Sequence, residues 1–455
     1  MREYRVLSPT AILGYGFPEE SFQAGLDRKP HLIAVDAGST DPGPYYLGAG
    51  VSFTDRAAVK RDLELMIEAG LQLDIPVVIG TAGGSGAEVH LQWNLDIIKE
   101  LVLEKGWQFP LGVIHAELER ETVLQAYREN KIAPLHPAPE LTEAEINAAE
   151  RIVAQMGPEP VMSVLQQGAK VVLAGRAYDP AVFSAGALLA GFDKGLAIHM
   201  GKILECGAIA ASPGSGSDCL LGTLREDCFI VEPLNPIRRC TPTSVAAHTL
   251  YEKTNPYVLP GPGGILDLRE TTFTQLSEQA VKVTGSKFVP AEPFAVKLEG
   301  AKRVGYRTVS IAGCRDSIMI AQIDHIVEAV RERVADNFKK YGYQYFLHFT
   351  IYGKNGVMGQ LEPNSDITSH ELGIIIEAVA ETQEIANTIC GFARSTMLHY
   401  GYPGRVATAG NLAFPYSPSD FKAGPVYNFN IYHLLEVVDP LALFPVEIMK
   451  MGEDQ

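Results

Sequence analysis

Hydrophobic residues in the first half of the chain follow two patterns. Short runs rich in β-branched residues predict strands at residues 4–13, 31–35, 76–79, 111–114 and 170–173. Longer stretches with apolar residues at helical spacing predict helices at 55–73, 88–105, 119–130 and 142–155, the last opening with the capping pair Thr142 and Glu145. Because helices separate the strands, we expect an α/β fold, with a mostly parallel sheet and covering helices.

The second half of the chain has a different pattern. A cluster of serine, proline and glycine at residues 212–217 predicts a domain boundary or an exposed loop. Beyond it we expect strands at 228–231, 295–298, 307–312 and 345–351, helices at 322–340 and 370–399, and a Pro/Gly loop at 256–264. The chain is therefore expected to hold an α/β domain of residues 1–215, which carries the active-site loops, and an α+β domain of residues 216–455.

Composition narrows the class of protein. With 455 residues, 46% hydrophobic and 20% charged, the chain is long enough for two folded domains. Its net charge of −16 repels polyanions, so nucleic acid is not an expected partner. No apolar run reaches the roughly 18–20 residues of a membrane span, and the N-terminus lacks a signal-peptide pattern, so we expect a cytoplasmic protein without membrane contact. The six cysteines form no C-x-x-C pair, and we expect them to be reduced.

Candidate site residues follow the predicted strands. Ligands of open α/β sheets bind beyond the carboxyl ends of the strands, where loops and helix N-termini converge. We therefore expect the residues after the five strands to surround one anionic ligand. In chain order these are Gly14 and Gly16; Asp36, Gly38, Ser39, Thr40 and Asp41; Thr81, Gly83, Gly84, Ser85 and Gly86; His115 and Glu117; and Arg176 and Asp179.

The glycine-rich loop at residues 80–86 has two interpretations. Its glycines allow backbone amides to point inward, which predicts a cradle for a carboxylate or phosphate. The alternative is a tight turn capped by Ser85. The loop is neither a Walker A motif nor a Rossmann fingerprint. Ser85 lies between a strand and a helix, as a hydrolase nucleophile does, but out of register with G-x-S-x-G.

The charged residues at two strand ends suggest acid–base or metal chemistry. Asp36 and Asp41 are candidates for a divalent cation such as magnesium or manganese, or for an acid and a base; the alternative is a structural role in a glycine turn. Arg176 is a candidate for binding a substrate carboxylate, with Asp179 orienting it. The alternative is that Arg176 and Asp179 pair only with each other.

Histidines supply the remaining candidates. His115 and Glu117 lie on one side of an extended segment and form a candidate proton-transfer pair, unless His115 is a hydrogen-bonded core residue. His199, Lys202 and Glu205 share one helix face, and this spacing is typical of a solvated surface.

These same loops resemble the acyclic terpene utilisation protein AtuA family. The matching runs are Leu-Gly-Tyr-Gly at 13–16, Val-Asp-Ala-Gly-Ser-Thr-Asp-Pro-Gly-Pro-Tyr-Tyr-Leu-Gly at 35–48, Ile-Gly-Thr-Ala-Gly-Gly-Ser-Gly at 79–86 and Leu-Ala-Gly-Arg-Ala-Tyr-Asp-Pro at 173–180. With Val-Ala-Ala-His-Thr-Leu-Tyr-Glu at 245–252 and Pro-Gly-Gly at 262–264, the resemblance covers roughly residues 5–410. It implies a role in the breakdown of terpenes and other branched acids through coenzyme A thioesters.

The resemblance also implies a partner. Some relatives continue into a C-terminal ferredoxin-like domain, which is marked by an Ala-Arg-Ser-Gly-Asp-Lys-Gly type run. That run is not found in this sequence. Shorter relatives are encoded beside a small companion protein, so we expect an oligomer, with a companion subunit as a candidate partner.

Three functions are compatible with these residues and this resemblance. The first is a lyase (a hydratase or dehydratase) or an isomerase acting on a small branched carboxylate or its CoA thioester, with the proton carried by His115 together with Asp36 or Glu117. The second is a hydrolase or acyl transferase that attacks a thioester or lactone through Ser85. The third is a non-catalytic, ligand-binding subunit of a hetero-oligomer.

Overall fold

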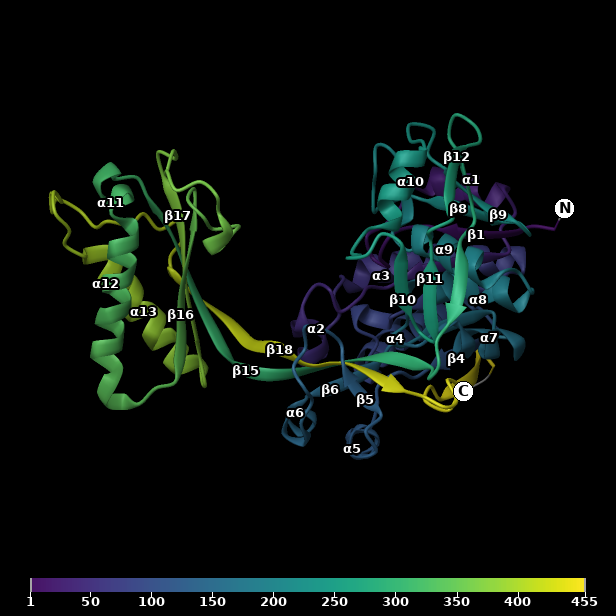
Figure 1. Cartoon of the computed structure of the whole chain (residues 1–455), viewed down its shortest axis with the longest axis horizontal. Coiled ribbons are helices and arrows are strands. Elements are labelled where there is room, and N and C mark those ends of the chain that lie inside the picture. The colour runs from purple at the N-terminus through teal and green to yellow at the C-terminus, as the bar shows by residue number, and fades with distance from the viewer. Residues whose placement is uncertain (1, 454–455) are drawn as a thin grey trace. The chain divides into compact units, whose positions relative to one another are not determined.

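The computed structural model describes residues 2–453, and its chain forms two compact units. Unit 1 comprises Met1–Lys302 and Phe429–Gln455, and unit 2 comprises Arg303–Asn428. The long strands β15 (Ala295–Cys314) and β18 (Asp420–Glu436) each belong partly to both units, so the chain enters unit 2 along one and leaves along the other (Figure 1). No helix within residues 2–453 is both long and apolar enough to cross a membrane.

A ten-stranded sheet forms the centre of unit 1. Its five middle strands are parallel and correspond to the five predicted ones, although the first ends earlier than expected. They lie in the order β1 (Tyr4–Ser8), β2 (Leu32–Asp36), β3 (Val77–Gly80), β7 (Val171–Ala174) and β4 (Phe109–Ile114). Antiparallel strands extend both edges: β8 (Leu220–Leu224), β9 (Cys228–Pro233), β13 (Val281–Thr284) and β12 (Thr272–Gln275) beside β1, and β19 (Val446–Met451) beside β4.

Helices cover both faces of this sheet because its middle strands are apolar on both sides. Val6 and Leu32 pack into one core with α7 (Pro158–Gln166), α8 (Asp179–Leu189) and α9 (Lys194–Leu204). Leu7 and Ile33 pack into the opposite core with α1 (Glu19–Asp27), α3 (Arg56–Leu73) and α4 (Glu88–Lys105). Alternating strand residues thus enter opposite cores, as a doubly covered parallel sheet requires. The predicted mixed α/β class is confirmed.

Smaller elements complete unit 1. A three-stranded antiparallel sheet contains β10 (Val258–Gly261), β11 (Gly264–Asp267) and β14 (Lys287–Pro290), so most of the expected Pro/Gly loop at 256–264 is a hairpin. The short strands β5 (Ile132–Pro134) and β6 (Arg151–Ala154) pair with β18 and β15. The remaining helices are α2 (Pro44–Ala49), α5 (Arg120–Arg128), α6 (Glu143–Ala148) and α10 (Pro242–Thr249).

Two expectations for unit 1 need correction. The helix predicted at 142–155 ends at Ala148, because the following residues form β6 and hydrogen-bond to β15. The expected domain boundary at residue 215 lies inside unit 1, because β8 pairs with β1 in register from Leu220 to Leu224 and carries the sheet onward. The structure divides instead within β15, after Lys302, and within β18, after Asn428.

Unit 2 has the β-α-β-β-α-β succession of a ferredoxin-like fold. Its elements after β15 are α11 (Ser317–Ala321), α12 (Ile323–Phe338), β16 (Tyr345–Tyr352), β17 (Leu372–Ala380) and α13 (Gln383–His399), and its strand order is β16-β17-β15-β18. The helix predicted at 370–399 is wrong in its first part, since β17 alternates buried Ile374 and Ile376 with more exposed neighbours. Both long helices pack on this sheet through one core.

Candidate functional site

Asp36 is the last residue of β2, and its carboxyl group is buried. The side chain is 6% exposed, and its Oδ1 atom has no hydrogen-bond partner among residues 2–453. Burial is the main cause that raises the pKa of Asp36 well above its usual value; Asp179 adds to the increase and Arg176 opposes it. Burial therefore favours the protonated form of Asp36 compared with an ordinary aspartate.

Arg176, in the loop after β7, is fully committed to other protein groups. Its Nε donates to Glu299 Oε2 at 2.6 Å and its Nη2 to Glu299 Oε1 at 3.4 Å, while its Nη1 contacts both the Ala177 carbonyl at 2.8 Å and Asp179 Oδ1 at 3.3 Å. Arg176 is only 1% exposed. The expected contact with a substrate carboxylate is therefore replaced by a buried ion-pair network, and the alternative, pairing with Asp179, is part of that network.

Glu299, on β15, anchors this network and was not predicted. It also accepts hydrogen bonds from Lys297 Nζ at 2.6 Å and from Thr40 Oγ1 at 2.8 Å, so Thr40 binds a protein carboxylate. Burial acts to raise the pKa of Glu299, but Arg176 and Lys297 outweigh it and lower the pKa to about 2. Glu299 lies 123 residues from Arg176, and no local pattern links the two.

Three residues expected on a solvated helix face are buried. His199, Lys202 and Glu205 are at most 4% exposed, because α9 packs against α8, β8, β9 and β14. The two nitrogens of His199 contact Ser286 Oγ and Thr249 Oγ1, and burial lowers its pKa to about 3, so His199 is a neutral structural residue.

Lys202 and Glu205 form a buried ion pair with one unused oxygen. Lys202 Nζ donates to Glu205 Oε1, whereas Glu205 Oε2 has no partner among the residues that the structure describes. Burial raises the pKa of Glu205 to about 7; Lys202 opposes this increase and Asp179 adds to it. Glu205 therefore exchanges its proton near neutral pH, unlike Glu299.

Two further residues are affected by the charge of Lys202: His248 on α10 and Lys253 shortly after it. His248 is 5% exposed, and its Nε2 atom has no partner within the described chain. Burial, followed by the charge of Lys202, lowers the pKa of His248 to about 4. Burial and then Lys202 also lower the pKa of Lys253. The only sequence signal was the family-like run at 245–252, which contains His248.

These groups make up one buried site, which we call the Asp36 cluster. Its members interact through the charges of Asp179 and Lys202, and three of them carry a buried polar atom without a partner. Unpaired buried polar atoms are costly and concentrate where a ligand completes them. The cluster combines two carboxyl groups whose pKa values are raised by burial, Asp36 and Glu205, with two lysines. Its members are Asp36, Asp179, Lys202, Glu205, His248 and Lys253.

The loop after β1 does not bind an external anion through its glycines. The amides of Gly14 and Gly16 donate to Asp62 Oδ2 at 2.9 and 3.1 Å. Asp62 is fully buried on α3, and its other oxygen pairs with Arg61 at 2.9 Å. The protein's own carboxylate therefore occupies the position that an anionic ligand was expected to take.

The amides of the glycine-rich loop after β3 are also used internally. The N–H groups of Thr81, Gly84 and Gly86 donate to backbone carbonyls at 3.1, 3.0 and 3.0 Å, and the Gly83 carbonyl accepts the Phe53 amide at 3.2 Å. All residues of the loop are buried. The alternative interpretation, a tight turn, therefore describes these amides better than an anion cradle does.

Close packing explains the glycines of this region. A Cβ atom on Gly86 would lie 2.1 Å from the backbone nitrogen of Arg176, and one on Gly38 would lie 2.8 Å from the Cα of Gly84. Ser85 is buried with its Oγ unpartnered among residues 2–453, so no base activates it as a nucleophile.

His115 and Glu117 lie at the end of β4 and contact Glu88 rather than each other. His115 Nδ1 is 2.7 Å from Glu88 Oε2, and the Glu88 amide donates to Glu117 at 2.7 Å. Burial raises the pKa of Glu117, and the main charges acting on it are Arg151, Glu88 and Glu119. The structure thus gives the two residues a local role that does not involve the Asp36 cluster.

Asp41 is not brought together with Asp36 as a metal pair. Asp41 is exposed, its amide donates to Ser39 Oγ at 3.1 Å, and its charge acts on Glu252. Within the described range 2–453, no group of three or more His, Cys, Asp or Glu side chains is arranged to hold a metal ion.

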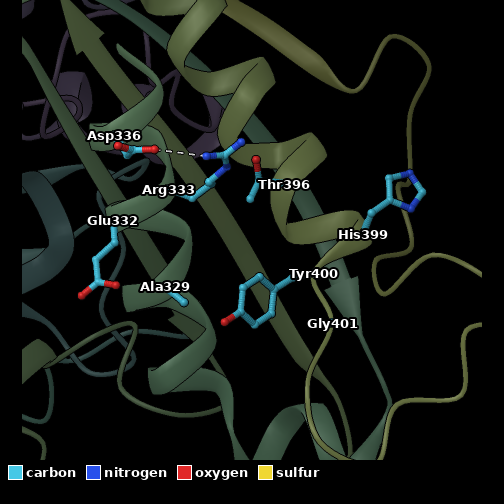
Figure 2. A pocket seen from close by; sticks show the side chains of 8 residues that line it. All are labelled: Ala329, Glu332, Arg333, Asp336, Thr396, His399, Tyr400 and Gly401. Atoms are coloured by element: carbon cyan, nitrogen blue, oxygen red, sulfur yellow. Dashed lines mark hydrogen bonds and ion pairs between the residues drawn. The ribbon is translucent and has the colours of Figure 1, made fainter. Parts of the chain in front are cut away.

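Unit 2 contains an open pocket without any of the predicted site residues. It has a volume of about 670 Å³ and is lined by residues of α12 and the C-terminal end of α13 (Figure 2). Its charged contact is the pair Arg333–Asp336, at 3.2 Å, on one helix. None of the buried, unpartnered polar atoms found within residues 2–453 belongs to a residue that lines this pocket.

Comparison with known proteins gives one match. The sequence model of the family described as acyclic terpene utilisation family protein AtuA matches residues 58–215 and 227–416, which include Arg176, Glu205, His248 and Lys253. No curated protein and no solved structure matches the chain. Because the match covers most of the sequence, the chain belongs to the acyclic terpene utilisation AtuA family.

Proposed function

We propose that the protein is a catabolic enzyme that moves a proton, or adds or removes water, on a small branched carboxylate or its CoA thioester. It would then be a lyase or an isomerase. The observation that carries this proposal is the buried carboxyl group of Asp36, which has an oxygen without a partner. A group of this kind can donate a proton to a substrate that completes its hydrogen bonding.

Glu205 is the second proton-transfer group of the proposed reaction. Acid–base enzymes hold two carboxyl groups in environments that set their pKa values apart. In the Asp36 cluster, burial favours the protonated form of Asp36, while Glu205 has a pKa of about 7 and one unpartnered oxygen. Asp36 would donate a proton to one atom of the substrate, and Glu205 would remove a proton from another.

The Arg176–Glu299 network would position this chemistry without touching the substrate. Arg176 holds Asp179 at 3.3 Å, and the charge of Asp179 contributes to the raised pKa values of both Asp36 and Glu205. We therefore assign Arg176 and Glu299 as positioning residues. The family match, whose description names acyclic terpene utilisation, is the reason for proposing a branched substrate.

The experiment is hydrogen exchange in D₂O. The purified protein is incubated with small branched carboxylic acids and their CoA thioesters, and deuterium incorporation is followed by mass spectrometry. The wild type should exchange a carbon-bound hydrogen, and Asp36→Asn should lower the rate by about 100-fold or more, the usual loss for a proton-transfer group. Asp41→Asn, which changes an exposed aspartate of the same loop, is the matched control. Exchange by Asp36→Asn at the wild-type rate, or no exchange of either compound class by the wild type, would contradict the proposal.

A further inference from the structure

The sheet of unit 2 is covered by helices on one face and is open on the other. The helices α12 and α13 pack on one face through the core that contains Leu347 and Ile376, and Figure 1 shows them on one side of β16 and β17. Alternate residues of each strand point away from this core. They are every second residue of β16 from Phe346 to Tyr352, of β17 from Gly373 to Val379, and of β15 from Arg307 to Gly313. We call this set the open face.

The open face is apolar where a face in contact with water is usually polar. An antiparallel sheet with one solvated face alternates apolar residues toward the core with polar residues toward water. On the open face, however, Phe346 is 57% exposed, Tyr352 is 48% exposed and Ile311 is 37% exposed. Val379, which lies opposite Phe346 on β17, is also partly exposed. Neighbouring exposed apolar side chains of this kind mark an interaction surface.

A hollow on the open face contains an ion pair. The hollow has a volume of about 530 Å³, and its lining includes Phe346, Val379 and Val426 together with Arg307 and Glu377. Arg307 Nε donates to Glu377 Oε1 at 2.5 Å. The two residues come from β15 and β17, the central strands of the order β16-β17-β15-β18. The open face therefore presents one positive and one negative charge side by side, next to apolar side chains.

We propose that the open face binds the open face of a second copy of this chain, so that the protein dimerises through unit 2. In a twofold interface the same surface meets itself, so residue i contacts residue j and residue j contacts residue i. Arg307 of each copy would lie against Glu377 of the other, and a face with one charge of each sign is complementary to itself. The whole chain carries a net charge of −16, so two copies repel each other unless they meet through a neutral surface such as this one.

The size of the open face also fits a dimer. Strands lie about 4.8 Å apart and residues advance about 3.3 Å along each strand, so four strands of about seven residues cover roughly 450 Å² in projection. Because side chains project from the sheet, the accessible area of two such faces exceeds their projected area and reaches the roughly 1,000 Å² that a specific interface needs. Two sheets packed in this way lie about 10 Å apart with interdigitating side chains. This inference does not depend on the proposed function.

The test is the mass of the full-length protein, measured by analytical ultracentrifugation at tens of micromolar protein. The wild type should be a dimer. Arg307→Glu and Glu377→Arg each place like charges against one another across the interface, so each should weaken dimerisation by about 100-fold or more. An equimolar mixture of the two variants should form a mixed dimer, because a pair of negative residues then meets a pair of positive ones. Arg333→Glu, at an exposed arginine of α12 on the covered side of the sheet, is the control and should dimerise like the wild type.

Phe346→Glu tests the same surface without breaking the ion pair. Because Phe346 is 57% exposed, the variant should keep the circular dichroism spectrum of the wild type, while its dimerisation weakens by about tenfold or more. If a charge variant fails to fold, Phe346→Glu decides the question.

Three results would overturn the inference. A monomeric wild type would show that another part of the chain or another protein covers the open face. A dimer of wild-type affinity in folded Phe346→Glu would place the interface on a different surface. Folded charge variants that stay monomeric when they are mixed would show that Arg307 and Glu377 do not meet across a twofold axis.

Discussion

The strand-end loops of unit 1 fall into two groups that looked alike in sequence. The loops after β1 and β3 are rich in glycine, but their amides are used by Asp62 and by backbone carbonyls. Asp36 ends β2 and Asp179 begins α8, after the loop that follows β7, and the region around them retains unpartnered polar atoms. Glycine content therefore marks close packing here. Ser85 Oγ in the loop after β3 is also unpartnered, so the candidate site is marked instead by unpartnered atoms on ionisable side chains that shift one another's pKa values.

The largest effect is expected at the network beneath the Asp36 cluster. Glu299→Gln leaves Arg176 and Lys297 without their carboxylate in a buried position. We expect a loss of about 3–5 kcal/mol in the free energy of unfolding, as for other broken buried ion pairs. Urea denaturation measures it. Glu100→Gln, which removes a surface ion pair with Arg56 and Lys60, should have a much smaller effect because solvent screens these charges. A loss in Glu299→Gln no larger than that of the control would contradict the account.

A pH-dependent effect is expected at Asp36. Its pKa is raised in the folded protein, so its contribution to stability is fully present below the unfolded pKa of about 3.9 and is lost as pH rises through the folded pKa. Each unit by which the folded pKa exceeds the unfolded pKa corresponds to about 1.4 kcal/mol in the free energy of unfolding. Asparagine has no ionisable group, so the Asp36→Asn variant does not lose stability in this way. The difference in the free energy of unfolding, variant minus wild type, should therefore rise between pH 4 and pH 8. Denaturant titrations at several pH values measure the difference, and a constant difference would show that Asp36 is ionised.

A moderate effect is expected in the loop after β1. Asp62→Asn keeps one oxygen for the Gly14 and Gly16 amides but removes the charge, and its NH₂ group cannot accept a hydrogen bond from Arg61 as Oδ1 does. The free energy of unfolding should fall by about 1–3 kcal/mol, the cost of unsatisfied buried groups. Deuterium exchange of the substrate should not change, because this loop is outside the Asp36 cluster. A loss of exchange in folded Asp62→Asn would place the loop in the site after all.

The smallest effect is expected at His115. It is partly exposed and contacts the exposed Glu88. His115→Ala should change the free energy of unfolding by at most about 0.5 kcal/mol, as is usual for surface substitutions. The exchange rate should stay within about twofold of the wild type. A large decrease in the rate would restore His115 as the proton-transfer residue that the sequence suggested.

The sequence predicted the five parallel strands, because continuous apolar runs between amphipathic helices specify this arrangement locally. It failed at residues 370–399, where Leu372–Ala380 pairs with β15 and β16 although the run is compatible with a helix. For the site, it identified Asp36 and Asp179 but treated Lys202 and Glu205 as surface. Their burial depends on β8, β9 and β14 packing against α9, and the role of Glu299 depends on a contact 123 residues away.

Infrared difference spectroscopy tests the central claim most directly, because a protonated carboxyl group and a carboxylate absorb separately. The comparison is the wild type against Asp36→Asn at pH 8, where Glu205, with a pKa of about 7, is mostly ionised. The account predicts that the wild type shows a protonated-carboxyl band that Asp36→Asn lacks and Asp41→Asn retains. A spectrum in which Asp36→Asn instead loses only a carboxylate band would contradict it.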